Sequence, residues 1–293
     1  MKPLVFALVA LVLAAATASA AKQRCASDSI AVGPLCVDRY EATVWQVPES
    51  KKALVNKIQR GEVTLAELRA AGAQQIGAMT EGSCVDDIHY PSTFPNDGGW
   101  TKPLYAVSVA GVLPTTCTTW FQAQQACRLS GKRLLRNEEW QAAAAGTPDS
   151  GINDNLTTTC ATASAFGVPT GSRSGCKSSW GVQDMVGNAW EWVAEWGETA
   201  TACGRWLPEM GDDLSCIGSG PEVMSSGWPV PRSGLYRPAN YVLIEEPVPG
   251  PNTPSGLIRG GNYAIQDRSG VFAYYQSIAP TTRSRSTGFR CAR

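Results

Sequence analysis

Ten cysteines constrain the fold of this chain more than any other feature. All ten lie downstream of an apolar N-terminal leader, and none shows the CxxC spacing typical of metal thiolate sites. An even number of cysteines in an exported chain favours disulfides, here five, over metal binding. The single histidine, His89, excludes histidine-rich zinc and iron sites and is interpreted as a surface or packing residue.

The first twenty residues have the layout of a secretory signal peptide. A basic Met1-Lys2 start precedes an apolar run over residues 4–16, and Ala18-Ser19-Ala20 forms a small-x-small cleavage site. The alternative is a membrane anchor, but the run is shorter than the roughly 20 residues that span a bilayer. We therefore expect removal of residues 1–20, an exported protein located in the periplasm or outside the cell, and no later transmembrane segment.

Composition indicates a loop-rich domain that does not bind nucleic acid. The formal net charge is zero, so the chain offers no basic field to a phosphate backbone. With 29 glycines, 19 prolines and 10 tryptophans, the chain favours many turns around a modest core and little long regular structure. Because no internal repeat or linker interrupts the sequence, residues 21–293 are expected to form one domain.

Local signals predict short strands near the N-terminus and three helical regions after them. The strands are expected at 35–37 and 40–44, and the helical regions cover 51–72, 120–129 and 137–145.

Two capping boxes mark where helices begin. Thr64 is followed three residues later by Glu67, and Thr119 is followed by Gln122 in the same way. Both pairs precede apolar residues at helical spacing, so each predicts a helix N-terminus.

The segment 197–256 is predicted to be a long loop elaboration. It is dense in proline, glycine and serine, and loops of this length are usually functional or disordered. Because it contains Cys203 and Cys216, we expect it to be at least partly ordered.

Four segments carry the most informative pattern when they are taken in order. They are DRYEATVW (38–45), TTWFQAQQACRLSGKRLLRNEEWQAAAAG (118–146), WGVQDMVGNAWEWVAEW (180–196), and GLIRGGNY (256–263) followed by TGFRCAR (287–293). By these segments the chain resembles the formylglycine-generating enzyme, or sulfatase-modifying factor, family over nearly the whole mature sequence. The resemblance implies an α+β domain related to C-type lectins, loop-rich and stapled by disulfides, which agrees with the composition.

The resemblance also implies a disulfide between Cys127, near the end of the second predicted helical region, and Cys291, in the terminal segment TGFRCAR. For the other cysteines, proximity along the chain favours four pairs, while other pairings stay open. These pairs are Cys25–Cys36, Cys84–Cys117, Cys160–Cys176 and Cys203–Cys216.

This chain lacks the two cysteines that bind copper in the resembled family. Formylglycine-generating enzymes hold copper(I) with two cysteines in a CxxxxC arrangement shortly after the Gly-Gly strand, and thiolates suit that soft ion. The matching positions are Ile265 and Gly270. We therefore expect no copper and no oxidase activity of this kind. A second branch of the family uses histidine-bound iron, which a chain with one histidine cannot provide.

The resemblance further implies one calcium site. Its donors would be the Asp184 side chain, the Gly187 and Ala189 carbonyls, and the Glu191 carboxylate, all hard oxygens as calcium prefers. The alternative is that Asp184 and Glu191 only cap turns. A second calcium site of relatives uses an asparagine where this chain has Ala161, so that site is in doubt.

These observations favour a non-catalytic binding or structural module with a protein or peptide ligand. The expected ligand surface is the 262–286 segment together with 197–256, because arginine and aromatic residues are enriched at recognition hot spots. Its candidate residues are Tyr263, Asp267, Arg268, Phe272, Tyr274, Tyr275, Arg283 and Arg285. The alternative is a family enzyme or maturation factor that acts on exported proteins with non-standard residues.

The tryptophans of the third segment have a simpler expectation. Trp190, Trp192 and Trp196 fall on alternate or nearly alternate positions, and they are expected to pack in the core rather than to stack on a ligand.

Overall fold

The computed structural model describes residues 24–79, 84, 103–198, 200–205, 213–218 and 254–293. The predicted signal peptide and His89 lie outside these residues. Within them, no helix has both the length and the apolar character needed to cross a membrane.

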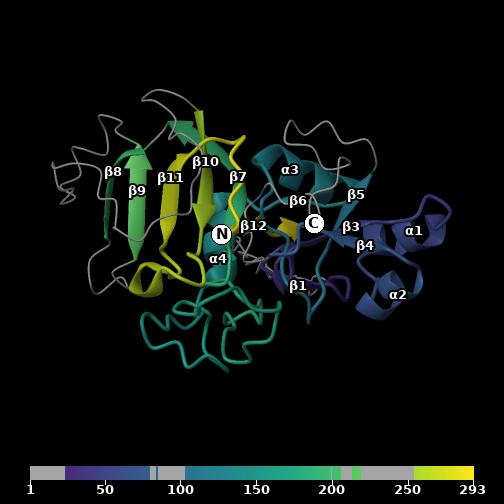
Figure 1. The fold of residues 1–293 in the computed structure, drawn as a ribbon, viewed down its shortest axis with the longest axis horizontal. Helices are drawn as coiled ribbons and strands as arrows, with labels where there is room; N and C mark the ends of the chain where they lie inside the picture. The colour runs from purple at the N-terminus through teal and green to yellow at the C-terminus, as the bar shows by residue number, and fades with distance from the viewer. Residues whose placement is uncertain (1–23, 80–83, 85–102, 199, 206–212, 219–253) are drawn as a thin grey trace, which may run out of the picture.

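Three sheets and four short α-helices make up the described part of the fold (Figure 1). A four-stranded sheet has the order β1 (Ser29–Val32), β2 (Leu35–Asp38), β13 (Cys291–Ala292), β6 (Arg133–Leu134). A six-stranded sheet has the order β12 (Thr287–Phe289), β7 (Trp190–Glu198), β10 (Pro254–Arg259), β11 (Tyr274–Ile278), β9 (Leu214–Gly218), β8 (Ala200–Arg205). A three-stranded sheet has the order β4 (Gln74–Ile76), β3 (Thr43–Gln46), β5 (Leu104–Val107). The α+β class and the scarcity of long regular elements agree with the sequence.

The helical region predicted over 51–72 is two helices rather than one. α1 (Lys52–Arg60) ends at Gly61, whose φ of 71° is the left-handed conformation that terminates a helix. A side chain at Gly61 would also collide with Asp28, because a Cβ there would lie 2.3 Å from Asp28 Oδ1. The chain then restarts as α2 (Leu65–Ala70) with the complete Thr64 capping box.

The other two helices pack their buried faces into the core. α3 (Trp120–Leu129) begins with the second capping box, between Thr119 and Gln122, as predicted. It packs against β5, β6 and β7. α4 (Asn137–Ala144) falls in the third predicted helical region and buries Trp140 and Ala144.

The two ends of the described chain are joined at the four-stranded sheet. β13 pairs with both β2 and β6, so the last strand lies between an early strand and the strand that follows α3. The fully buried ammonium of Lys132 lies 2.7 Å from Asp28 Oδ2 and 2.6 Å from Asp38 Oδ1. Burial raises the pKa of Asp38 to about 6, although Lys132 opposes the rise.

Four disulfides confirm the predicted pairing of eight cysteines. They are Cys25–Cys36, Cys84–Cys117, Cys127–Cys291 and Cys160–Cys176. Cys216 is also disulfide-bonded, and Cys203 is its register partner across the β8–β9 pair; the side chain of Cys203 lies outside the described residues. No free cysteine occurs in the part of the chain that the structure describes.

The prediction of one long loop over 197–256 is corrected by four strands. The end of β7, then β8 and β9, and the first residues of β10 lie inside that range, and β8 and β9 extend one edge of the six-stranded sheet. β9 runs parallel to β11 while β8 closes the edge as its antiparallel partner. Residues 219–253 lie outside the described chain.

The expectation for the tryptophans holds for two of the three. Trp190 and Trp192 are buried in the core cluster that also contains Phe289 and Ile258. Trp196 is 44% exposed. It lies beyond a register shift between β7 and β10, where the strand has left the core and reaches the start of α3.

Candidate functional site

The loop that precedes β7 is held by side-chain bonds to the backbone. Asp184 and Asn188 have φ values of 59° and 56°, a conformation that asparagine and aspartate tolerate better than most residues. Asp184 Oδ2 accepts a hydrogen bond of 2.6 Å from the Gly171 amide. The Asn188 side chain accepts from the Val168 amide and donates to the Val168 carbonyl, so it bridges the loop to a neighbouring turn.

A buried cluster of charges lies beneath this loop. The guanidinium of Arg290 contacts Glu191 Oε1 at 2.7 Å, and both side chains are shielded from solvent. Trp140 Nε1 donates to Glu191 Oε2 at 2.8 Å. Glu41 joins the cluster from the start of the chain, accepting from the Ala189 amide at 3.1 Å and from the Asn188 side chain.

Electrostatics in the cluster disfavour full ionisation of its carboxyl groups. Burial raises the pKa of Glu41 well above its usual value, and the nearby charges of Asp184 and Glu191 raise it further. Burial likewise raises the pKa of Asp184 to about 6. Arg290 keeps its charge, because the carboxylates, Glu191 first, outweigh the burial that would lower its pKa.

This cluster contains two of the four predicted calcium donors. With three carboxyl groups against one guanidinium, its charge suits an additional cation, and Asp184 supplies a hard oxygen. Both Glu191 oxygens, however, already accept bonds from Arg290 and Trp140. No group of three or more His, Cys, Asp or Glu residues with metal-binding geometry is present among the described residues. A calcium ion here would therefore rest on two carboxylates and two carbonyls, and it stays a proposal.

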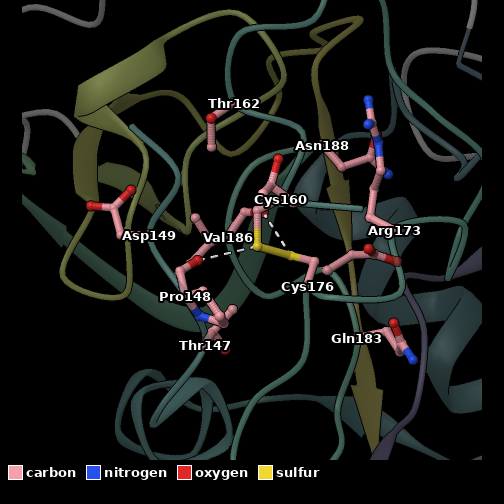
Figure 2. The surroundings of a disulfide bond; sticks show 12 residues. Thr147, Pro148, Asp149, Cys160, Thr162, Arg173, Cys176, Gln183, Val186 and Asn188 are labelled. Carbon is pink, nitrogen blue, oxygen red and sulfur yellow. Dashed lines mark hydrogen bonds between the residues drawn. A yellow bond between two sulfur atoms is a disulfide. The ribbon is translucent and has the colours of Figure 1, made fainter. Parts of the chain in front are cut away.

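At the position of the second calcium site, the backbone carbonyl already accepts a hydrogen bond. Ala161 has no side-chain oxygen, and its carbonyl accepts from the Asn188 amide at 2.8 Å. The adjacent Cys160–Cys176 disulfide fixes the surrounding loops, as Figure 2 shows, with Pro148 and Asp149 on one side and Arg173 and Gln183 on the other. Cys160 Sγ lies 3.2 Å from the Pro148 carbonyl oxygen, and Cys176 Sγ lies 3.5 Å from that of Val186.

The two positions that match the copper ligands of the resembled family are structural. Ile265 is buried in the main core cluster. Gly270 lies against the carboxyl group of Asp213, so closely that a Cβ at Gly270 would be 2.0 Å from Asp213 Oδ1. Real Cβ contacts stay beyond 3.0 Å, so no side chain fits at Gly270 while Asp213 keeps its place. Neither Ile265 nor Gly270 supplies a sulfur donor.

The predicted ligand-binding residues do not form one exposed face. Tyr263 is buried against Met79 and Ala189, which makes it a core residue. Tyr274 is half-buried, and the centre of its ring lies 5.5 Å from Arg259 Cζ. Its hydroxyl donates a hydrogen bond to Gln276 Oε1.

The remaining members of that set are partly exposed. Asp267 forms an ion pair of 2.8 Å with Arg205. Tyr275 packs against the core at Trp190, with ring centroids 6.2 Å apart. The other four are half-buried: Arg268, Phe272, Arg283 and Arg285.

An exposed aromatic cluster was missed by the sequence analysis. Trp120, Phe121 and Trp196 meet edge to face, with ring centroids 5.0 to 5.5 Å apart. Phe121 is 43% exposed. The buried apolar residues of α3, which are Ala123, Ala126 and Cys127, recur at helical spacing and leave Phe121 on another face of the helix.

Comparison with known proteins agrees with the resemblance read from the motifs. A family model described as a sulfatase-modifying factor enzyme 1-like domain matches residues 20–293. No curated protein sequence matches the chain.

Solved structures with related folds are remote. The Major Tropism Determinant M1 variant is 17% identical, with 91% of this chain and 52% of that chain covered and a TM-score of 0.43. The chain thus spans about half the length of that protein. CarF is 14% identical over 88% of this chain and 85% of its own, with a TM-score of 0.41. PvdO from Pseudomonas aeruginosa is 17% identical, with 88% of this chain and 80% of that chain covered and a TM-score of 0.35. On the family match across nearly its whole length, the chain belongs to the family of sulfatase-modifying factor enzyme 1-like domains.

Proposed function

We propose that this chain is an exported binding or structural module of the family that lacks copper-dependent oxidase activity. The observation that carries the proposal is the packing at Gly270, where the Asp213 carboxyl group fills the space that a side chain would need. Ile265, the other matching position, is part of the core. Neither position offers a thiolate, and the described cysteines are all in disulfides.

Export is supported by the disulfides of the fold, which form in oxidising compartments. Four described disulfides connect segments up to 164 residues apart, and such bonds persist in oxidising compartments. With the apolar leader of the sequence, this supports a location in the periplasm or outside the cell.

The proposed ligand is a protein or peptide, bound by the partly exposed residues of the 262–286 segment. Arg268, Arg283 and Arg285 supply guanidinium groups, and Tyr275 supplies an aromatic surface beside them in sequence. Tyr263 and Tyr274 are left out of the proposed surface, because Tyr263 is packed in the core and Tyr274 lies against Arg259. Arginine and aromatic side chains of this kind dominate recognition hot spots.

A paired-variant experiment tests the binding role. The variant Arg283→Ala/Arg285→Ala should lose partners that the wild-type protein captures by cross-linking from the exported protein fraction. Arg60→Ala, a substitution at an exposed arginine on α1, serves as the control and should keep them. The binding surface is misplaced if both variants capture the same partners as the wild type.

A second function is a family enzyme with non-standard residues, for which Asp213, packed against Gly270, is the candidate group. Burial raises the pKa of Asp213 to about 7, which places a proton donor or acceptor of neutral pKa beside position 270. Oxygen consumption with a cysteine-containing peptide, measured with and without added copper, separates the two functions. We expect no consumption above the peptide blank; turnover would establish the enzyme.

Calcium at the loop before β7 is part of the proposal. Asp184, Gly187, Ala189 and Glu191 would hold it, and its role would be to neutralise the excess carboxylate charge around Glu41. Metal analysis of protein purified without chelators tests this, with about one calcium per chain expected.

A further inference from the structure

The Cys84–Cys117 disulfide differs from the other described bridges in the backbone of one of its cysteines. Cys117 has a φ of 55°, in the left-handed region that few residues other than glycine adopt. Among the half-cystines that the structure describes, no other has a positive φ. A residue strained in this way persists only where the surrounding structure holds it, and such residues are concentrated at functional sites.

The backbone around Cys117 is anchored to two distant segments. The Cys117 amide donates a hydrogen bond of 2.8 Å to the Ser284 carbonyl. The Thr118 carbonyl accepts a bond of 3.0 Å from Trp192 Nε1. These bonds and the bridge to Cys84 together hold Cys117 in its left-handed conformation, so opening the bridge removes one of the restraints.

The two cysteines of this bridge differ in their access to solvent. Cys117 is 3% exposed and belongs to the main core cluster, whereas Cys84 packs against that cluster and is partly exposed. A thiolate in solution can therefore approach Cys84 and not Cys117. The Cys127–Cys291 and Cys160–Cys176 bridges are buried at both ends, so a thiolate reaches them only after local unfolding.

The Cys25–Cys36 bridge offers a matched comparison. It also joins a partly exposed cysteine, Cys25, to a buried one, Cys36. Neither residue has a positive φ, and Cys36 lies in the regular strand β2. Because exposure is similar in the two bridges, the strained backbone is the feature that distinguishes Cys84–Cys117. Strained and exposed disulfides are the ones that exchange most readily with thiols.

We propose that Cys84–Cys117 is an exchangeable disulfide that reacts with an external dithiol. A thiolate of the dithiol attacks Cys84 Sγ, the bond between the two cysteines breaks, and its electron pair leaves on Cys117 Sγ, which takes up a proton. The second thiol then attacks the dithiol's own sulfur in the mixed disulfide and releases Cys84. The dithiol becomes a disulfide, the bridge gains two electrons, and the two protons of the dithiol end on Cys84 and Cys117.

Reduction has a structural consequence at residue 117. Once the bridge is open, Cys117 is free to leave the left-handed region, and its hydrogen bond to the Ser284 carbonyl loosens. The bridge is thus a redox-sensitive restraint on the contact between residues 117 and 284. This proposal stands independently of the proposed binding function.

Glutathione redox buffers test the exchange on the intact, disulfide-bonded protein. After equilibration, free thiols are trapped by alkylation and mapped by peptide mass spectrometry, while near-ultraviolet circular dichroism verifies that the protein stays folded. We expect Cys84–Cys117 to be half-reduced in a buffer at least about tenfold less reducing than the one that Cys25–Cys36 requires. Equal midpoints, or opening of Cys84–Cys117 only together with Cys127–Cys291, would overturn the proposal.

Two further readouts on the same samples test the mechanism. Glutathione should form its mixed disulfide on Cys84, because only this cysteine is accessible, and an adduct on Cys117 instead would contradict the order of attack. Hydrogen exchange of the Cys117 amide should accelerate when the bridge is reduced. An unchanged exchange rate would show that reduction does not release the strained backbone.

Two double variants make the test specific. Cys84→Ser/Cys117→Ser should remove the most easily reduced bridge and leave the midpoint of Cys25–Cys36 unchanged. Cys25→Ser/Cys36→Ser should leave the midpoint of Cys84–Cys117 unchanged. If the removal of Cys25–Cys36 shifts the Cys84–Cys117 midpoint by tenfold or more, the easy reduction comes from coupled opening of the two bridges and the proposal fails.

Discussion

Placing a methyl group at position 270 tests the packing that excludes a copper ligand. In Gly270→Ala the new Cβ would lie 2.0 Å from Asp213 Oδ1, about 1 Å inside the closest contact that real side chains make. Asp213 must move, and the hydrogen bond from the Phe272 amide is lost or stretched. A hydrogen bond to a charged group contributes about 1.5–3 kcal/mol, and overpacking costs about 1–3 kcal/mol, so we expect a loss of roughly 2.5–6 kcal/mol in unfolding free energy.

Guanidinium chloride unfolding, followed by tryptophan fluorescence with disulfides intact, measures this loss. In a double-mutant cycle, Asp213→Gly removes the group that a methyl at position 270 would collide with. Gly270→Ala should therefore cost much less unfolding free energy in the Asp213→Gly background than in the wild type. The expected coupling is about 1–3 kcal/mol. If Gly270→Ala costs less than about 0.5 kcal/mol, or if the two substitutions are additive, then Asp213 does not fill the space at position 270 and the reasoning fails.

Four further outcomes follow from the buried charges and the disulfides. Glu191→Gln should cost about 3–5 kcal/mol in unfolding free energy by leaving the Arg290 charge without its partner, whereas Glu62→Gln on the surface should cost little. Replacing Cys127 and Cys291 by alanine should cost up to about 4–5 kcal/mol, because the bridge closes 164 residues. Burial raises the pKa of Asp38 to about 6, so its stability contribution is complete below the unfolded value near 3.8 and is lost as pH rises through 6. Unfolding at pH 5 and 8 should show the wild type more stable at pH 5, with the difference reduced in Asp38→Asn. Chelation with EDTA should lower the melting temperature if calcium is bound, and Asp184→Asn should abolish that change.

Short-range features of the fold could be predicted from the sequence. The Thr64 and Thr119 capping boxes are complete within four residues, and both mark helix starts correctly. Disulfides between cysteines near in sequence, such as Cys160–Cys176, follow from proximity. The Cys127–Cys291 bridge required the family resemblance, because loop length alone does not select a partner so distant.

The candidate site could be predicted only in part, because its contacts join distant segments. Glu41 was not selected, although it lies beneath the loop before β7, 148 residues from its partner Ala189. Burial of Tyr263 was missed for the same reason, since a tyrosine in a polar, glycine-rich segment has no local signal that distinguishes core from surface.

Copper(I) binding at equilibrium tests the central claim most directly. The reduced ion is titrated anaerobically into the purified, disulfide-bonded protein in competition with a coloured copper(I) chelator. With Ile265 in the core and Gly270 closed by Asp213, we expect the protein to remove no copper from the chelator. Transfer of one copper per chain, retained in Gly270→Ala but lost when cysteines are alkylated, would contradict the claim that the family's thiolate site is absent.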